Sequence, residues 1–558
     1  MQFVKPARLM NEIGMKKKKL KMTKQAWLTL FALSLALFIV VLDGSIMNVS
    51  MKAIAKDLGT SFQNMQVLIT YYSLVLAALT LIGARLGDIY GRKRVFLIGT
   101  ALFGLGALIA SISKNSIMLL IGWSFIEGIG AALMMPATVS LMSTSFRGEA
   151  RAIGYGVWGG VAAAGASIGP IIGGYVTTYY TWRLAFFLEL IPVFLVFVLA
   201  KYIVDKKEYI LKERRLDIWG SVLSSFGLGL LIFGILKVND YGWFIPKANT
   251  PAILGLSISF LSMLFGLLLI VGLIIAEIKC KQKEHCYPLI EIDLFKNRQF
   301  NVGLLITLMQ SLAQAGMLFV LPLFLLTIKG YTAIQTGIAL LPVTISVLVF
   351  SAGLSRLKVD VKIILVIGFI LVALSSYWLA NILAVDLTMK DLIGPLAVFG
   401  AGLGLIAAKL TNIVISAFDV KRASEASGIN ATLRRLGAAL GTAIMGTILF
   451  MQINKNLTEL IRHESSLPSF VKEKIVSAIS SSHFKIGTSG SSEVMHTYIE
   501  TKSNVNNIFV KQITHAVQKD LQKAIIQASK TTLVITSLAT LVTMCTVLLL
   551  PKRLQLSN

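Results

Sequence analysis

The sequence predicts an all-α protein that crosses a membrane many times, and three observations lead to this expectation. The chain of 558 residues is 55% hydrophobic, with a mean hydropathy of +0.77, which lies outside the range of soluble domains. Apolar stretches long enough to cross a bilayer, about 20 residues each, recur along its length. Lysine and arginine collect in alternate connections between these stretches.

Fourteen such stretches make up the expected helices. Their flanking connections are short except near the carboxyl end, which is typical of a polytopic helix bundle. The stretches lie near residues 27–49, 67–86, 95–113, 117–141, 153–176, 183–204, 217–237, 253–276, 302–327, 337–355, 363–384, 392–418, 433–453 and 531–550.

The formal net charge of +26 follows membrane topology. The amino-terminal tail and the second-to-third, sixth-to-seventh and eighth-to-ninth connections are basic, whereas the alternate short connections carry little beyond Lys114, Lys329 and Lys390. Because positive loops stay in the cytoplasm, both termini are expected there. The same placement accounts for the charge without nucleic acid, so nucleic-acid binding is not expected.

The helices divide into six, two and six. For the long outer segment, helical spacing of apolar residues from Val505 to Ile525 favours a hairpin capping the outer face, and a poorly ordered loop is the alternative. The expected parts are a basic cytoplasmic tail at 1–26, a six-helix bundle at 27–204, two additional helices with cytoplasmic connections at 205–299, five helices of a second bundle at 300–453, an extracytoplasmic loop at 454–530, the last helix at 531–550 and a cytoplasmic tail at 551–558.

Several kinds of chemistry are excluded by missing residues. The chain has no G-x-x-x-x-G-K-[ST] phosphate loop, and all five histidines fall in expected loops, so an enzyme acting inside the membrane lacks its base. Cys280, His285 and Cys286 are too few for a zinc site, and a reducing compartment argues against a disulfide between the cysteines. No enzyme, metal or cofactor is expected.

The fifth expected helix carries an unusual glycine pattern, G-x8-G-P-x-x-G-G. Positions 165, 169 and 173 recur every four residues and form a smooth stripe that lets a neighbouring backbone approach closely. Position 160 falls on roughly the opposite face, which predicts close contacts on two sides. A generic packing face is the alternative interpretation. The pattern consists of Gly160, Gly169, Pro170, Gly173 and Gly174.

This pattern is similar to the antiporter signature of the major facilitator superfamily, and the chain resembles its fourteen-helix drug:proton antiporters of the EmrB/QacA type. The resemblance covers about residues 27–453 and 531–550. It implies two six-helix bundles around a central cavity, alternating access, and multidrug efflux of amphipathic or toxic compounds against inward proton flow. Other similar motifs occupy 42–49, 85–93, 182–183, 241–243, 294–298, 321–342 and 425–441.

The resemblance also implies partners and a location. These are a small-molecule substrate and protons, the lipid bilayer, a periplasmic adaptor protein, a monomeric chain and the cytoplasmic (inner) membrane of a bacterium. Two other functions stay open: export of an endogenous metabolite, siderophore or lipid by the same fold, and a non-transporting membrane sensor or scaffold that uses 454–530.

Charged residues inside the spans are functional hypotheses, because an unpaired charge in lipid costs several kcal/mol. For Asp43 in the first helix, the resemblance implies proton coupling or cationic-substrate binding. A carboxyl in a low dielectric can alternate between charged and neutral forms. A structural acid hydrogen-bonded to Ser45, Asn48 or a neighbouring helix is the alternative.

The fourth and sixth helices depart from the family pattern. Ser124 stands where the family carries an arginine implicated in proton transfer. Glu127 is then either the proton carrier or a substitute for the glutamine often found there. Glu189 stands near the outer end of the sixth helix, where the group usually has asparagine, and is a further coupling candidate.

Lys409 lies in the twelfth expected helix, about 14 Å from its cytoplasmic end at 1.5 Å per residue. It either snorkels toward the interface or faces the cavity. In the cavity it would pair with Glu127 or attract an anionic substrate.

A conformational latch is implied after the second helix. There Asp88 would meet the partly positive amino end of the thirteenth helix near Asn430. Gly91 would permit the turn that follows, and Arg92 would face the anionic leaflet.

Overall fold

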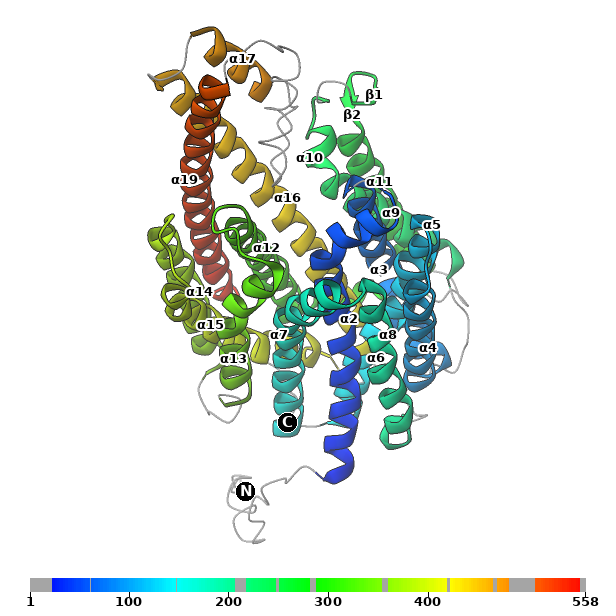
Figure 1. Cartoon of the computed structure of the whole chain (residues 1–558). Helices are drawn as coiled ribbons and strands as arrows, with labels where there is room; N and C mark the ends of the chain where they lie inside the picture. Colours follow the sequence, from blue (N-terminus) through cyan, green and yellow to red (C-terminus); the bar gives the residue numbers. More distant parts are fainter. Residues whose placement is uncertain are drawn as a thin grey trace, which may run out of the picture.

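A computed structural model gives the structure of the protein (Figure 1). The amino-terminal tail before residue 23, the basic residues of 206–216, His285, Cys286 and most of the expected joint at 480–493 lie outside the described residues. The described residues are 23–60, 62–146, 148–205, 217–246, 250–281, 288–353, 360–418, 422–464, 469–480 and 507–551.

Thirteen helices in the described part of the chain are long and apolar enough to cross a membrane. They coincide with thirteen of the fourteen expected stretches. The remaining stretch, 153–176, coincides with α7 (Gly148–Tyr179), a continuous helix of 32 residues. The helices expected from hydropathy are therefore present, and several of them extend beyond the apolar stretches.

The first six spans surround one apolar core, in which Phe96, Phe103 and Trp123 are fully buried. They occupy the right-hand part of Figure 1. The fourth span is built from three consecutive segments, and the sixth ends in a short 3-10 turn. Besides α7, the elements are α2 (Lys24–Asp57), α3 (Phe62–Tyr90), α4 (Arg92–Ser111), α5 (Ser116–Leu119), the π-helix η1 (Leu120–Glu127), α6 (Gly128–Ser145), α8 (Trp182–Leu199) and η2 (Ala200–Tyr202).

The two additional helices pack against each other, and α9 also packs against α3. The expected start of the second at residue 253 is wrong, because a hairpin precedes it. Leu254 and Gly255 both have positive φ, 54° and 73°, which suits a tight turn between two short antiparallel strands. The elements are α9 (Ile218–Leu236), α10 (Val238–Tyr241), β1 (Ala252–Ile253), β2 (Leu256–Ser257) and α11 (Ile258–Lys281).

Cys280, near the end of α11, is disulfide-bonded. The expectation of reduced cysteines in this connection is therefore wrong for Cys280. That expectation was based only on the reducing compartment, which does not determine whether two cysteines lie close enough to bond.

The last six spans form a second core on the left of Figure 1, with Phe324, Phe369 and Phe399 fully buried. Apolar side chains of α3, α12, α15 and α16 form a smaller cluster where the two halves meet. The elements are η4 (Ile292–Lys296), α12 (Arg298–Thr327), α13 (Ala333–Gly353), α14 (Val361–Ile382), α15 (Met389–Ser416), α16 (Ala423–His463), α17 (Ser469–Ser480) and α19 (Asn507–Val547).

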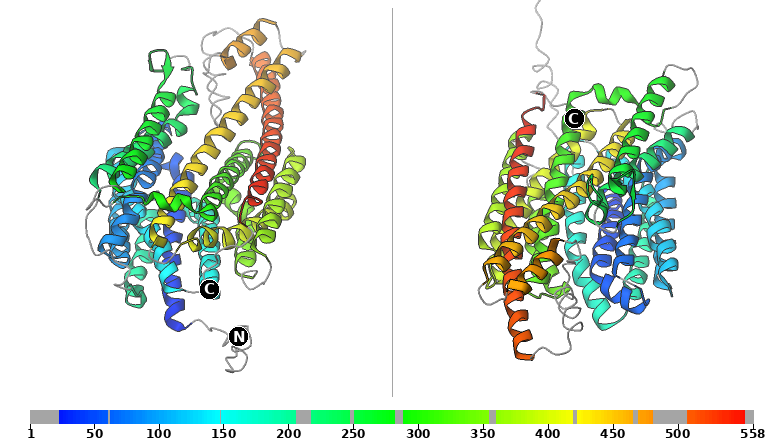
Figure 2. Two further views of the ribbon diagram at one scale, coloured as in Figure 1. Left: turned by 180° about the vertical axis from the view of Figure 1, so that it is seen from behind. Right: turned by 90° about the horizontal axis from the view of Figure 1, so that it is seen from above.

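Two helices are far longer than a membrane requires. α16 and α19 each have 41 residues and rise together past the other helices to meet α17, at the end opposite the start of α2 (Figures 1 and 2). Leu457, Ile461 and Ile525 are buried between them. The described parts of 454–530 are helical, and the connection at 481–506 lies outside the described residues, so the hairpin stays a prediction.

The glycines of α7 pack on two sides, as their spacing predicts. Added Cβ atoms at Gly165 and Gly173 would lie 3.2 Å from the Phe38 carbonyl oxygen and 3.1 Å from Ile46 Cα, both in α2. A Cβ at Gly160 would lie 2.6 Å from Leu348 Cδ2 in α13, in the other half. The helix continues through Pro170. α7 thus forms one close seam with its own half and another with the opposite half.

A polar clamp joins three helix ends on the α17 side. Arg183 Nη1 donates to Asp57 Oδ2 at 2.7 Å, and its Nη2 donates to the Ser113 carbonyl at 2.8 Å. Trp182 Nε1 donates to the same Asp57 oxygen at 3.1 Å. The bonds from Arg183 and then Trp182 hold the pKa of Asp57 below its usual range.

This clamp gives a small pH dependence. Because the folded-state pKa of Asp57 is lowered, its stabilisation is present above the unfolded pKa of about 4 and is lost as pH falls through the lower folded value. We expect Asp57→Asn to cost at most about 1 kcal/mol at pH 7, since both partners are part exposed. The difference from the unsubstituted protein should close below about pH 4.

Thermal unfolding of detergent-purified protein at pH 7, 5 and 3.5 measures this effect. Asp386→Asn, at an exposed acid on the same side, is the control and should show no such trend. A pH-independent difference for Asp57→Asn would contradict the assignment.

Candidate functional site

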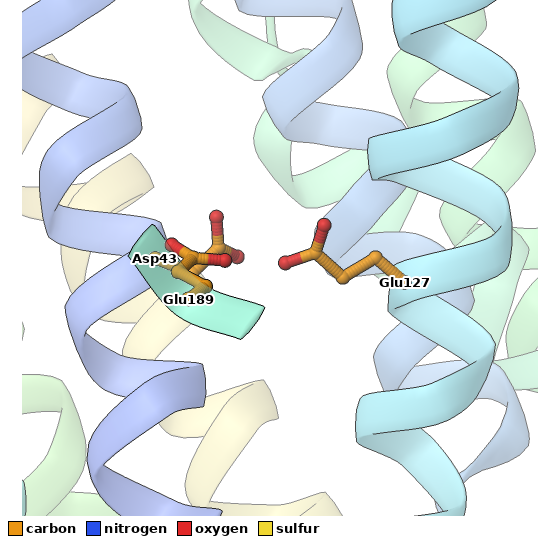
Figure 3. A group of neighbouring side chains, drawn as sticks. All are labelled: Asp43, Glu127 and Glu189. Atoms are coloured by element: carbon orange, nitrogen blue, oxygen red, sulfur yellow. The ribbon is translucent and has the colours of Figure 1, made fainter. Parts of the chain in front are cut away.

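Three carboxyl groups from three helices meet inside the first bundle. Asp43 of α2, Glu127 of η1 and Glu189 of α8 point toward one another, with Glu127 facing the other two (Figure 3). One oxygen of each lies within 4.8 Å of the others, and each residue is at most 1% exposed. These three residues form the carboxyl triad.

The local backbone explains how Glu127 reaches this position. η1 is a π-helix of eight residues that interrupts the fourth span and ends at Glu127. Such wide turns are rare and are often found at functional sites. Gly106 of α4 lets η1 approach closely, since an added Cβ there would lie 2.6 Å from Glu127 Cβ.

Two aromatic residues that sequence reasoning missed support the triad. Trp123 Nε1 donates to Asp43 Oδ1 at 2.7 Å, and the Trp123 ring stacks on Tyr72 with centroids 4.8 Å apart. The structural alternative for Asp43 is confirmed in part, because its donor Trp123 comes from a neighbouring helix. Ser45 Oγ instead bonds carbonyl oxygens of its own helix and of Gly165, and the Asn48 side chain lies outside the described residues. A tryptophan four residues before an intramembrane glutamate was the available signal.

The triad lacks compensating positive charge among the described residues. The oxygens of Glu127 and Glu189 and Oδ2 of Asp43 have no hydrogen-bond donor there. Two carboxylates at this separation repel by at least about 3 kcal/mol at an effective dielectric of 20. The three groups therefore hold protons in common or exchange them for a cation, which is chemistry suited to coupling.

Two other expected site residues lie apart from the triad. Ser124 Oγ donates to the Leu68 carbonyl at 2.9 Å, so it faces α3. Lys409 in α15 is half-buried and forms no ion pair within the described residues, so of its alternatives the pairing with Glu127 is not present. With three acids in mutual contact, Glu127 faces carboxyls of its own half.

The expected latch residues are partly as predicted. Gly91 has φ 100°, which confirms that a glycine permits this turn. Arg92 is 1% exposed and its Nη2 lies 3.0 Å from Asp88 Oδ1, so the expectation that it faces the leaflet is wrong. A buried guanidinium requires a partner, and Asp88 one turn earlier supplies it.

The end of α3 packs against the start of α16. An added Cβ at Gly428 would lie 2.8 Å from Ala84 Cβ. Asp88 lies close enough to Glu425, in the first turn of α16, for the two negative charges to repel each other. The latch carboxyl and the helix start are therefore neighbours.

Comparison with known proteins gives consistent results. The family model described as Major Facilitator Superfamily matches residues 33–442. Multidrug export protein EmrB of Haemophilus influenzae is 29% identical over 435 residues, covering 77% of this chain and 82% of that protein. Multidrug resistance protein Stp of Mycobacterium tuberculosis is 26% identical over 464 residues, covering 82% of each.

Among solved structures, the crystal structure of the human organic anion transporter MFSD10 has a TM-score of 0.50 at 12% identity. It covers 75% of this chain and 92% of that one. At this identity the likeness concerns the fold alone.

Proposed function

Because the chain belongs to the major facilitator superfamily, we propose that this multi-pass membrane protein is a proton-coupled exporter of amphipathic drugs or toxic compounds. The names of EmrB and Stp, an export protein and a resistance protein, support export. Transport proceeds by alternating access between the two six-helix halves.

The carboxyl triad is the observation that carries the proposal. Protons bound there drive transport only if they bind the two conformations with different affinity. The triad joins α2, η1 and α8, so a shift of any one of them changes the separation of the carboxyls. Reduced separation favours protonation and increased separation favours release, which links proton affinity to conformation.

The remaining elements have supporting roles. Asp88, with Gly91 and Arg92, holds one conformation by contact with the start of α16. Gly160, Gly169, Pro170, Gly173 and Gly174 keep α7 closely packed during the change. The outer bundles at 27–204 and 300–453 with 531–550 are the moving units, and both termini lie in the cytoplasm of a bacterial cell. A monomeric state and a periplasmic adaptor partner complete the proposal.

Efflux measurements test this proposal. A fluorescent amphipathic dye is added outside inverted membrane vesicles. Respiration generates the proton gradient, and a protonophore collapses it in a parallel sample. We expect uptake into inverted vesicles only with the gradient, and proton release from the lumen on substrate addition. Gradient-independent flux would contradict proton coupling, and no flux for any dye would contradict export.

A further inference from the structure

Two adjacent arginines stand deep inside α16, and no part of the carboxyl triad chemistry uses them. Arg434 is nine residues beyond Glu425, where the membrane-length part of α16 begins, or about 14 Å along the helix. Charged side chains at this depth are rare and usually face a cavity or a partner.

Both arginines reach across to the amino-terminal half. The Arg434 guanidinium carbon lies 5.6 Å from the ring centroid of Trp158 in α7. Arg435 interacts electrostatically with Tyr72 in α3. Both side chains are half-buried.

Acidic partners are missing around the pair. Neither arginine forms an ion pair within the described residues. Between Glu425 and Glu459, α16 contains no acid, and α12 to α15 contain only Asp391, in the first turn of α15. In the opposite half, the three acids of the carboxyl triad contact one another, and Asp57 and Asp88 pair with Arg183 and Arg92.

A buried donor beside Arg434 lacks an acceptor as well. Trp158 is 3% exposed, and its indole Nε1 has no hydrogen-bond partner among the described residues. The indole nitrogen can only donate, and a buried donor left unpaired is unfavourable. An acceptor from outside the chain would satisfy it.

We propose that Arg434, Arg435 and the indole N–H of Trp158 bind the anionic group of the exported compound, a carboxylate on an aromatic molecule. This inference rests on the proposed export function. Guanidinium groups bind carboxylates by paired, charge-assisted hydrogen bonds, and the aromatic face of Trp158 suits an apolar ring. Two unpaired arginines repel cations, so an organic cation is the disfavoured cargo.

Binding of matched acids and amides to the purified full chain in lipid nanodiscs tests the site. The probes are benzoate, naphthalene-2-carboxylate and anthracene-2-carboxylate, each beside its neutral carboxamide. Isothermal titration without a proton gradient measures affinity. We expect at least one acid to bind at least about tenfold more tightly than its amide, as one or two charge-assisted hydrogen bonds provide.

Variants assign that preference to residues. Arg434→Gln and Arg435→Gln should each weaken binding of the acid at least about tenfold and leave binding of the amide unchanged. Trp158→Phe keeps the ring, removes the N–H and should weaken the acid by a smaller factor. Arg298→Gln, at the exposed start of α12, is the matched control and should change neither.

If the glutamine variants fail to fold, Arg434→Lys replaces them, because it keeps the positive charge and loses the planar guanidinium. In this variant the acid should bind more weakly than in the unsubstituted protein, but still more tightly than the amide. An equal affinity for acid and amide in all three pairs overturns the proposal, as does acid binding that is unchanged in both Gln variants. Intact acid binding without gradient-driven flux would contradict the export function instead, because the binding assay uses no gradient.

Discussion

Replacing Glu127 with Gln is expected to abolish gradient-driven efflux while the protein remains folded. The substitution keeps the size of the side chain and removes one of the three groups that exchange protons. We expect a loss of about a hundredfold or more, the low end of what a positioned proton-transfer group contributes. Exchange of substrate without a gradient should persist, because it needs no change of protonation.

Transport in inverted vesicles and thermal unfolding of purified protein are measured together. The unfolding midpoint should be unchanged or raised, since a buried carboxyl without a donor is lost. Glu277→Gln is the matched control: Glu277 is 1% exposed in α11, and its Oε1 accepts the Leu289 N–H at 3.0 Å, outside the triad. Full coupling in Glu127→Gln would place the coupling step elsewhere.

Replacing Gly169 with Ala is expected to disrupt the contact between α2 and α7. The added Cβ would lie 1.7 Å from Ser45 Oγ and 2.8 Å from Ser45 Cβ, so one helix must shift. Overpacking of this kind costs about 1–3 kcal/mol. We therefore expect a lower unfolding midpoint and a parallel loss of efflux.

Gly44→Ala is the control on the neighbouring helix, because no described atom lies within 4 Å of a Cβ added there. Combining Gly169→Ala with Ser45→Ala should restore part of the stability, since it removes the nearest atom. Equal midpoints for Gly169→Ala and Gly44→Ala would contradict the described packing.

Much of the fold could be predicted because the bilayer forces a simple pattern on the chain. Span length and loop charge predicted helices over the whole membrane part. The four-residue glycine spacing predicted the seam of α7 with its own half, and the opposite face of position 160 predicted the second seam. The hairpin before α11 was missed, because hydropathy does not register the two positive φ angles at Leu254 and Gly255.

The site was less predictable, since contacts between distant helices decide it. Asp43, Glu127 and Glu189 were each singled out, yet sequence could not reveal that they meet. Trp123 looked like an ordinary apolar residue of its span. Arg434 and Arg435 lie in the motif at 425–441, yet sequence could not reveal that they reach the other half, and α16 starts at Ala423, ahead of the stretch expected from 433.

The double packing of α7 bears on how fast the protein can work. A seam between helices with interlocked side chains moves in discrete jumps, each with its own barrier. At Gly160 there is no side chain to interlock with Leu348, so sliding against α13 meets little resistance. We therefore expect a side chain at position 160 to raise the barrier between states and to slow turnover.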